Sequence, residues 1–202
     1  GKVTKRQKEN IEVVLNSGRR MADLISALLN VSRLELGVFA INTKPVVISE
    51  AADESLKELE PQIAAKKLKI VKDYSPELPR MNADPIFLKI IWQNLISNAV
   101  RYSPPKTTVT IKIGKDNNNF LMMVSDQGIG ISQEDRDGIF TKFYRAGNAR
   151  LFETDGTGLG LYITKLILDA AGGKIRFDSA LNKGTSFYVT VPLKGMITQS
   201  TK

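Results

Sequence analysis

The sequence predicts an α+β fold: a two-layer α/β sandwich in which helices cover one face of a mixed, mostly antiparallel sheet, preceded by a long N-terminal helix. Two observations indicate this fold. Apolar residues recur every three or four positions from about Gln7 to Gly37, which is the spacing of a helix with one apolar face. After Gly37, strand-like runs come in pairs separated by helical segments, a pattern that favours an antiparallel sheet with helices on one side.

The N-terminal helix carries an apolar stripe that is too broad to face water alone. The stripe consists of Ile11, Leu15, Gly18, Ala22, Ile25, Leu29, Ser32 and Leu36, widened by Val14, Met21 and Leu28. Its length and near-heptad spacing favour packing in a bundle with another chain or domain, and packing on its own domain is the alternative. Gly37 supplies a stop for the helix.

The remaining elements follow from strand-like runs and helix boundary signals. The helix from Asp84 to about Tyr102 is the clearest, because aspartate is a good capping residue and Pro85 suits the first helical position. Ser49 is the predicted cap of an earlier helix. In chain order, we expect a strand at 41–48, a helix at 49–67, a strand at 68–73, the helix at 84–102, strands at 109–113 and 120–124, a helix at 159–171, and strands at 174–179 and 185–191.

Composition excludes several classes of site. The chain has 202 residues, of which 42% are hydrophobic, enough to bury a core. It contains neither cysteine nor histidine, which excludes disulfides, thiolate zinc sites, imidazole ligands, and Ser-His or Cys-His nucleophile pairs.

The charge and hydropathy of the chain give weaker indications. The formal net charge is +8, which suits nucleic acid, a membrane surface or a small polyanion, but on charge alone a solvated basic surface is the preferred interpretation. No apolar run approaches the roughly 20 residues that cross a bilayer. The polar start, Gly1 to Lys8, does not resemble a signal peptide.

The first segment with chemical content lies on the helix that begins at Asp84. Asn94, Asn98 and Arg101 are spaced four and three residues apart, so their side chains share one face of that helix. Amide oxygens are hard ligands suited to Mg²⁺, and a guanidinium suits phosphate oxygens. Taken alone, an exposed polar stripe remains the better interpretation of these three residues.

The second segment combines a carboxylate with glycines. Asp126, Gly128 and Gly130 follow directly after an apolar strand. The glycines let the backbone approach a ligand closely, and the carboxylate can accept a hydrogen bond from an exocyclic amine. A tight turn that happens to contain an aspartate is the alternative.

The third segment, Gly156-Thr157-Gly158-Leu159-Gly160-Leu161, opens a helix. Free N–H groups and the helix dipole make such a start a natural anion site. The segment is not a P-loop, which needs Gly-Lys-Ser/Thr, and it is not a dinucleotide fingerprint, which needs glycine where Leu161 stands. Before it, Ile139 to Arg145 carries Lys142 and Arg145 and leads into the polar stretch Ala146 to Asp155, which we expect to be a mobile lid with cations at its base.

In this order and spacing, the segments resemble the Bergerat-type ATPases and, within them, the sensor histidine kinases. The similarity rests on the asparagine box NLISNAVRYS (94–103), the first glycine box DQGIGI (126–131), the phenylalanine box IFTKFYR (139–145), the second glycine box GTGLGL (156–161) and the closing strand KGTSFYVTVP (183–192). RRMADLISALLNVSRLELG (19–37) is similar to the second helix of the kinases' dimerisation and phosphotransfer hairpin.

The resemblance implies a site for ATP and Mg²⁺. Asn94, Asn98 and Arg101 would be catalytic, with Asn98 coordinating Mg²⁺ and Asn94 beside it at the triphosphate. Asp126 would accept a hydrogen bond from the adenine amino group. The other implied nucleotide-binding residues are Tyr102, Gly128, Gly130, Lys142, Arg145, Gly156, Thr157, Gly158, Leu159, Gly160 and Thr185. The chain departs from the family pattern at Arg101, where lysine is common, and at Ala171, where histidine is often found.

The main choice within this fold is between hydrolysing ATP and transferring its phosphate to histidine. The hydrolytic relatives carry a glutamate at the Asn94 position to activate water, and an amide cannot act as a base. We therefore expect the catalytic region of a two-component sensor histidine kinase, which transfers the γ-phosphate to a histidine outside this chain for relay to a response regulator aspartate. Without a histidine of its own, the chain should not autophosphorylate.

Two alternatives remain. A degenerate kinase could use nucleotide only to rigidify and signal through its helix, although the intact glycine boxes and both asparagines argue against this. An anti-sigma-type serine kinase has the same fold, but the hairpin-like N-terminal helix and the Phe-Tyr-Arg segment argue against it.

The resemblance also implies domains and partners. Residues 1–37 would be the partial phosphotransfer hairpin, 38–195 the ATP-binding catalytic domain and 196–202 a tail. The expected partners are the missing phosphotransfer helix, within a homodimer, and the receiver domain of a response regulator. Nucleic acid is not expected, because no interleaved aromatic platform is present. We expect a cytoplasmic location, with membrane contact only through regions absent from this chain.

Overall fold

A computed structural model describes residues 41–153 and 156–196, together with Thr4, Gln7, Ile11, Val14, Gly18, Met21 and Ile25. The chain divides into two compact units, Gly1–Phe39 and Ala40–Lys202.

The described residues of the first unit show a helix with a defined start. Thr4 and Gln7 form a capping box: Gln7 N donates to Thr4 Oγ1 (3.3 Å), and Thr4 N donates to Gln7 Oε1 (2.9 Å). Each described residue from Gln7 to Ile25 is helical. The apolar members of the predicted stripe among them are 49 to 70% exposed: Ile11, Val14, Met21 and Ile25. The rest of the predicted helix, up to Gly37, lies outside the described residues.

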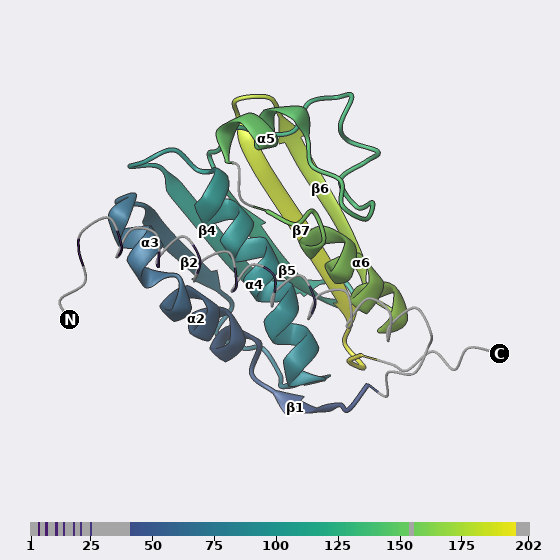
Figure 1. Cartoon of the computed structure of the whole chain (residues 1–202). Helices are drawn as coiled ribbons and strands as arrows, with labels where there is room; N and C mark the ends of the chain where they lie inside the picture. Colours follow the sequence, from purple (N-terminus) through teal and green to yellow (C-terminus); the bar gives the residue numbers. More distant parts are fainter. Residues whose placement is uncertain are drawn as a thin grey trace. The chain divides into compact units, whose positions relative to one another are not determined.

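A five-stranded sheet forms one layer of the second unit (Figure 1). In spatial order its strands are β2 (Lys69–Tyr74), β4 (Thr108–Asp116), β5 (Asn119–Ser125), β7 (Gly184–Pro192) and β6 (Lys174–Ala180). β2 pairs with β4 in parallel, and the other neighbours pair antiparallel. A separate two-stranded sheet joins β1 (Lys44–Val46) to β3 (Met81–Ala83). The mixed, mostly antiparallel sheet confirms the predicted fold class.

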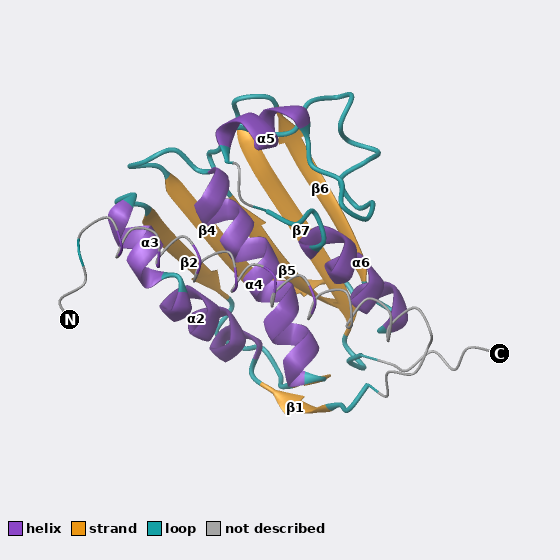
Figure 2. Ribbon diagram, viewed as in Figure 1, coloured by secondary structure: helices purple, strands orange, loops and turns teal. Residues whose placement is uncertain are grey.

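Helices cover one face of this sheet (Figure 2). α2 (Ile48–Glu58), α4 (Pro85–Tyr102) and α6 (Gly160–Ala170) lie across it, α3 (Glu60–Ala65) follows α2, and α5 (Gly147–Phe152) lies near one end of the strands. α4 is central, because it contacts both α2 and α6. Within the described residues, no helix is long and apolar enough to span a membrane.

The core lies between α4 and the inward-facing residues of the strands. α4 buries Phe87, Leu88, Ile91, Trp92, Leu95, Ile96, Ala99 and Val100. Burial alternates along β5, as expected for a strand with one face against a helix layer. Each fully buried side chain of this size contributes about 1.5–3 kcal/mol, so α4 is held firmly, and the polar residues on its remaining face have a fixed location.

The start of α4 agrees with the prediction. Asp84 Oδ1 accepts hydrogen bonds from Ile86 N (2.9 Å) and Phe87 N (3.4 Å). Its Oδ2 accepts from Asn42 N (2.9 Å), which ties the chain before β1 to the same cap. One carboxylate therefore organises two segments that are far apart in sequence.

Other predicted boundaries are wrong. The helix predicted at 49–67 is two helices separated by Leu59, because Pro61 in the first turn of α3 lacks the N–H that a continuous helix would need. Ser49 is not the cap; Val47 occupies that position without a side-chain hydrogen bond. The strand predicted at 41–48 shortens to β1, β3 was missed, and α5 forms inside the polar stretch that was expected to be a lid.

Candidate active site

Asn94 joins the exposed face of α4 to the start of α6. Its Nδ2 donates to Gly160 O (2.9 Å) and to Thr164 Oγ1 (3.1 Å), and Thr164 is fully buried. These two bonds fix which way the carboxamide points, so Oδ1 is the atom available as an acceptor or metal ligand. A Cβ at position 160 would lie 3.0 Å from that oxygen, so a larger residue than glycine would press on the Asn94 carboxamide.

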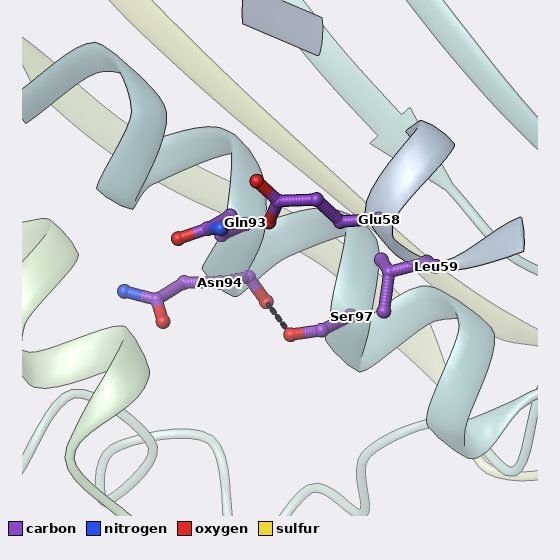
Figure 3. Close-up of a pocket in the computed structure, with 5 residues that line it drawn as sticks. All are labelled: Glu58, Leu59, Gln93, Asn94 and Ser97. Carbon is purple, nitrogen blue, oxygen red and sulfur yellow. Dashed lines mark hydrogen bonds between the residues drawn. The ribbon is translucent and has the colours of Figure 1, made fainter. Parts of the chain in front are cut away.

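A pocket of ≈ 240 Å³ lies beside Asn94, between α2 and α4 (Figure 3). It is lined by Glu58, Leu59, Gln93, Asn94 and Ser97, and the Asn94 carboxamide points away from Glu58. The Glu58 carboxylate accepts from Lys89 Nζ (2.6 Å) and from Gln93 Nε2. The bond from Lys89 lowers the pKa of Glu58 most, which makes this nearby carboxylate a poor base.

Two guanidinium groups converge at Gly156. A Cβ at this glycine would lie 3.3 Å from Arg101 Nη1 and 3.5 Å from Arg145 Cζ. Arg145 Nη2 also donates to Glu153 O and to Ala149 O (3.4 Å), which ties it to the segment containing α5. Two cations at a glycine before a helix start are groups suited to a polyanion.

Asp126 is half-buried and asymmetrically bonded. Its Oδ1 accepts from Gly128 N (2.8 Å) and Thr185 N (3.2 Å), while Oδ2 has no hydrogen-bond partner among the residues that the structure describes. Burial raises the pKa of the carboxyl to about 6, although the two N–H groups favour the charged form. Oδ2 is thus an acceptor available to a ligand.

Three glycines allow the backbone to pack closely around this carboxylate. A Cβ at Gly128 would lie 2.5 Å from Tyr102 O, and one at Gly130, where φ is +66°, would lie 2.0 Å from Ala180 O. A Cβ at Gly184 would lie 2.0 Å from Asp126 O. Four segments of the chain therefore meet at this carboxylate, and Gly184 lies among them although no local sequence pattern marks this glycine as part of a site.

The Thr185 hydroxyl bonds within the protein. It lies 2.9 Å from Ser179 Oγ, which donates to Gly184 O (2.9 Å) and accepts from Ile131 N (2.8 Å). The only proton of the Ser179 hydroxyl is used in the bond to Gly184 O, so the Thr185 hydroxyl must donate to Ser179 Oγ. The Thr185 oxygen keeps lone pairs that can accept a hydrogen bond.

The second glycine segment packs against the lid base. At Gly158, where φ is +69°, a Cβ would lie 2.6 Å from Phe143 C. Leu159 is buried, and its N–H donates to Thr157 Oγ1 (3.2 Å). Lys142 is exposed, with Nζ 5.3 Å from the centre of the Tyr162 ring on α6.

The lid is also anchored to the first glycine segment. Asn148 Nδ2 on α5 donates to Gly130 O (2.9 Å). Just before the lid, Tyr144 Oη donates to Asp135 Oδ1 (2.7 Å), beyond the first glycine segment. The lid stretch therefore contacts the first glycine segment through Asn148.

The metal-ligating potential of the site rests on amides. Among the described residues, no group of three or more acidic, histidine or cysteine side chains could hold a metal ion. Asn94 Oδ1, oriented as above, and Asn98, which makes no side-chain hydrogen bond within the described part of the chain, are hard oxygen donors that fit Mg²⁺ completed by phosphate oxygens and water.

Comparison with known proteins identifies the family. A sequence profile described as "Histidine kinase-, DNA gyrase B-, and HSP90-like ATPase" matches residues 83–195. The chain belongs to this family. The match spans all the boxes described above, which confirms the resemblance read from the sequence.

The curated relatives of this ATPase-family chain include a histidine kinase and a sensor protein. It is 31% identical over 199 residues to the circadian input-output histidine kinase CikA of Synechococcus elongatus, covering 98% of this chain and 26% of that protein. It is 31% identical over 191 residues to the sensor protein SrrB of Staphylococcus aureus, covering 92% and 32%. The chain thus spans a quarter to a third of these relatives and corresponds to the ATPase catalytic domain of two-component sensor kinases.

Solved structures agree with this assignment. Full-length ShkA in complex with AMPPNP superimposes with a TM-score of 0.80 at 26% identity, covering 100% of this chain and 41% of that one. The nucleotide-free catalytic domain of histidine kinase ThkA gives a TM-score of 0.65 at 25% identity, covering 75% and 97%.

Proposed function

We propose that this chain binds Mg-ATP and positions its γ-phosphate for transfer to a histidine that lies outside the chain. Residues 38–195 would be the catalytic domain and 1–37 part of the dimerisation and phosphotransfer hairpin, with 196–202 a tail. The observation that carries the choice of kinase over ATPase is Asn94: an amide, tied by Nδ2 to α6, stands where a hydrolytic relative would need a carboxylate.

The base would be held by the first glycine segment. Asp126 Oδ2 would accept from the adenine amino group, since Oδ1 is already occupied by two backbone N–H groups. Tyr102 would pack against the base, and the Thr185 hydroxyl would accept from a water in the same pocket.

The triphosphate would be held by cations and backbone. Arg101 and Arg145 converge at Gly156, and Lys142 stands at the lid base. Backbone N–H groups of the segment from Gly156 to Gly160 would face the phosphates, except that of Leu159, which donates to Thr157 Oγ1. Asn98 and Asn94 would hold Mg²⁺, which when bound neutralises charge that develops on the phosphate oxygens.

The reaction would be an in-line displacement. A nitrogen of the acceptor imidazole forms a bond to the γ-phosphorus while the bond to the β–γ bridging oxygen breaks, and the electron pair leaves with ADP. The chain's own residues contribute positioning and charge, because a phosphoryl transfer of this kind needs little covalent help. The phosphoryl group would then pass to an aspartate in a response regulator.

Calorimetric titration with Mg-AMPPNP tests the binding part of this proposal. The Asp126→Ala variant should bind at least about tenfold more weakly, because a half-buried polar contact to the base is lost. Asp116→Ala is the control, since Asp116 is exposed at the end of β4. Equal affinities for the wild type and the Asp126 variant would remove this carboxylate from the site.

A further inference from the structure

Lys66 is a partly exposed cation that lies outside the boxes in sequence. It follows α3, and its Nζ donates to three backbone carbonyls: Val100 O (3.0 Å), Arg101 O (2.6 Å) and Ser103 O (3.1 Å). An ammonium group has three protons, so this arrangement uses all of them.

The three carbonyls belong to the C-terminal end of α4. The last carbonyls of a helix have no partner within the helix, and a cation there also interacts favourably with the helix dipole. Since α4 ends before Pro104, the helix cannot supply these partners by continuing. Lys66 therefore caps α4 from a different segment of the chain.

The capped turn is the one that presents two proposed nucleotide-binding side chains, Arg101 and Tyr102. On its other side, Tyr102 O accepts from Ile129 N (3.3 Å) in the first glycine segment. The turn is thus held by Lys66 through its carbonyls and by the first glycine segment through Tyr102 O. A shift of this turn would move a phosphate-binding cation and a base-packing ring together.

The same ammonium group meets the end of the lid. Nζ lies 5.8 Å from the centre of the Phe152 ring at the end of α5. Burial lowers the pKa of Lys66, the nearby Glu153 opposes this shift, and Arg101 adds to it. Lys66 therefore lies where the end of α4 and the end of the lid helix come together.

We propose that Lys66 is a positioning residue for nucleotide binding, which fixes the last turn of α4 so that Arg101 and Tyr102 meet the nucleotide. It acts through these residues and does not itself touch ATP. The inference rests on the proposed function, because the roles of Arg101 and Tyr102 belong to it.

The test compares substitutions at two adjacent lysines. Lys66→Met removes the ammonium while keeping the length of the side chain, and Lys66→Arg keeps a cation with N–H donors. Lys67→Met is the matched control, because Lys67 is exposed and its side chain makes no hydrogen bond or ion pair among the described residues. For each protein, Mg-AMPPNP affinity is measured by calorimetry at a temperature where circular dichroism shows it fully folded, and the unfolding midpoint is recorded separately.

We expect Lys66→Met to bind Mg-AMPPNP about tenfold more weakly, because a displaced turn no longer holds Arg101 and Tyr102 where the nucleotide needs them. Lys66→Arg should recover most of the affinity, and Lys67→Met should bind like the wild type. A lower unfolding midpoint with unchanged affinity would mean that Lys66 is only a structural cap and would refute the proposal. If Lys66→Met does not fold, Lys66→Gln takes its place, because glutamine keeps two N–H donors without the charge. Weaker nucleotide binding would again support the proposal, and a lower unfolding midpoint with unchanged affinity would again refute it. Failure of the wild type itself to bind would refute the proposed function, and the role of Lys66 with it.

Discussion

Lowering the pH should weaken nucleotide binding through Asp126. The pKa of this carboxyl is raised to about 6 by burial, and Oδ1 is committed to two N–H groups. A proton would therefore add to Oδ2, the oxygen that the adenine amino group needs. Protonation converts this acceptor into a donor that faces another donor.

The magnitude follows from the pKa. If only the ionised carboxyl binds, affinity is nearly constant above pH 7 and falls about tenfold by pH 5, one unit below the pKa. Calorimetric titrations with Mg-AMPPNP at several pH values would measure this. The terminal phosphate also takes up protons as pH falls, so Asp126→Asn, which has no titrating group at this position, serves as the reference. A wild-type profile parallel to that of Asp126→Asn would refute the reasoning.

The raised pKa of Asp126 also predicts how the stability of the nucleotide-free chain depends on pH. The pKa of Asp126 in the folded chain lies above its ordinary value of 3.8, so the folded state favours the protonated carboxyl. The contribution of Asp126 to the free energy of unfolding is therefore fully present below pH 3.8 and is lost as the pH rises through about 6. The loss amounts to about 3 kcal/mol. Denaturant unfolding of the wild type and of Asp126→Asn across this range would show the difference, and a wild type that gains stability relative to the variant as pH rises would contradict it.

Three further outcomes are expected. Gly184→Ala should lower the free energy of unfolding by about 3 kcal/mol or more in denaturant unfolding, because the added Cβ would lie 2.0 Å from Asp126 O at a residue whose φ is +90°. Gly114→Ala is the control, because nothing lies within 4 Å of the added atom there. Equal losses of stability in the two variants would contradict the account. ATP turnover should be at least a hundredfold below the typical enzyme rate of about 10 per second, since Asn94 offers no carboxylate to a water; a coupled assay giving typical rates would reveal another base. Replacing Ile11, which is 49% exposed, by lysine should reduce self-association of the chain in analytical ultracentrifugation, because each apolar side chain buried on association contributes about 1.5–3 kcal/mol. The same replacement at the exposed Ile86 should not change self-association. A monomeric wild type would exclude association through the apolar stripe of the N-terminal helix.

Locally encoded elements of the fold could be predicted from the sequence. α4 was located accurately because its start signal, Asp84-Pro85, and its apolar spacing lie within the helix itself. The hairpin of β4 and β5 was found for the same reason. β3 was missed because three residues are too few to show an alternating pattern, and the break at Leu59 was missed because the segment on both sides of it favours helix.

The candidate site shows the same difference between local features, which the sequence predicts, and contacts between distant residues, which it does not. The ordered boxes include segments that meet at Asp126 and at Gly156 in the folded chain, and each box could be recognised because it is a short local pattern. The roles of these residues in nucleotide binding stay a prediction. The bonds between segments could not be predicted in this way: Gly184 approaches Asp126 across two paired strands, and Lys66 reaches Arg101 across 35 positions. No local pattern distinguishes Lys66 from its neighbour Lys67; only the folded chain brings one of them to the end of α4.

The most direct test of the kinase assignment supplies the histidine that the chain lacks. A phosphotransfer helix containing the acceptor histidine, taken from a homologous sensor kinase and fused before Gly1, would be incubated with Mg²⁺ and ATP labelled at the γ-phosphate. The account predicts an acid-labile, base-stable label on that histidine, and its loss when Asn98 is replaced by alanine. A fusion that binds Mg-AMPPNP normally yet labels no histidine would contradict the central claim and favour a nucleotide-binding module that signals without phosphoryl transfer.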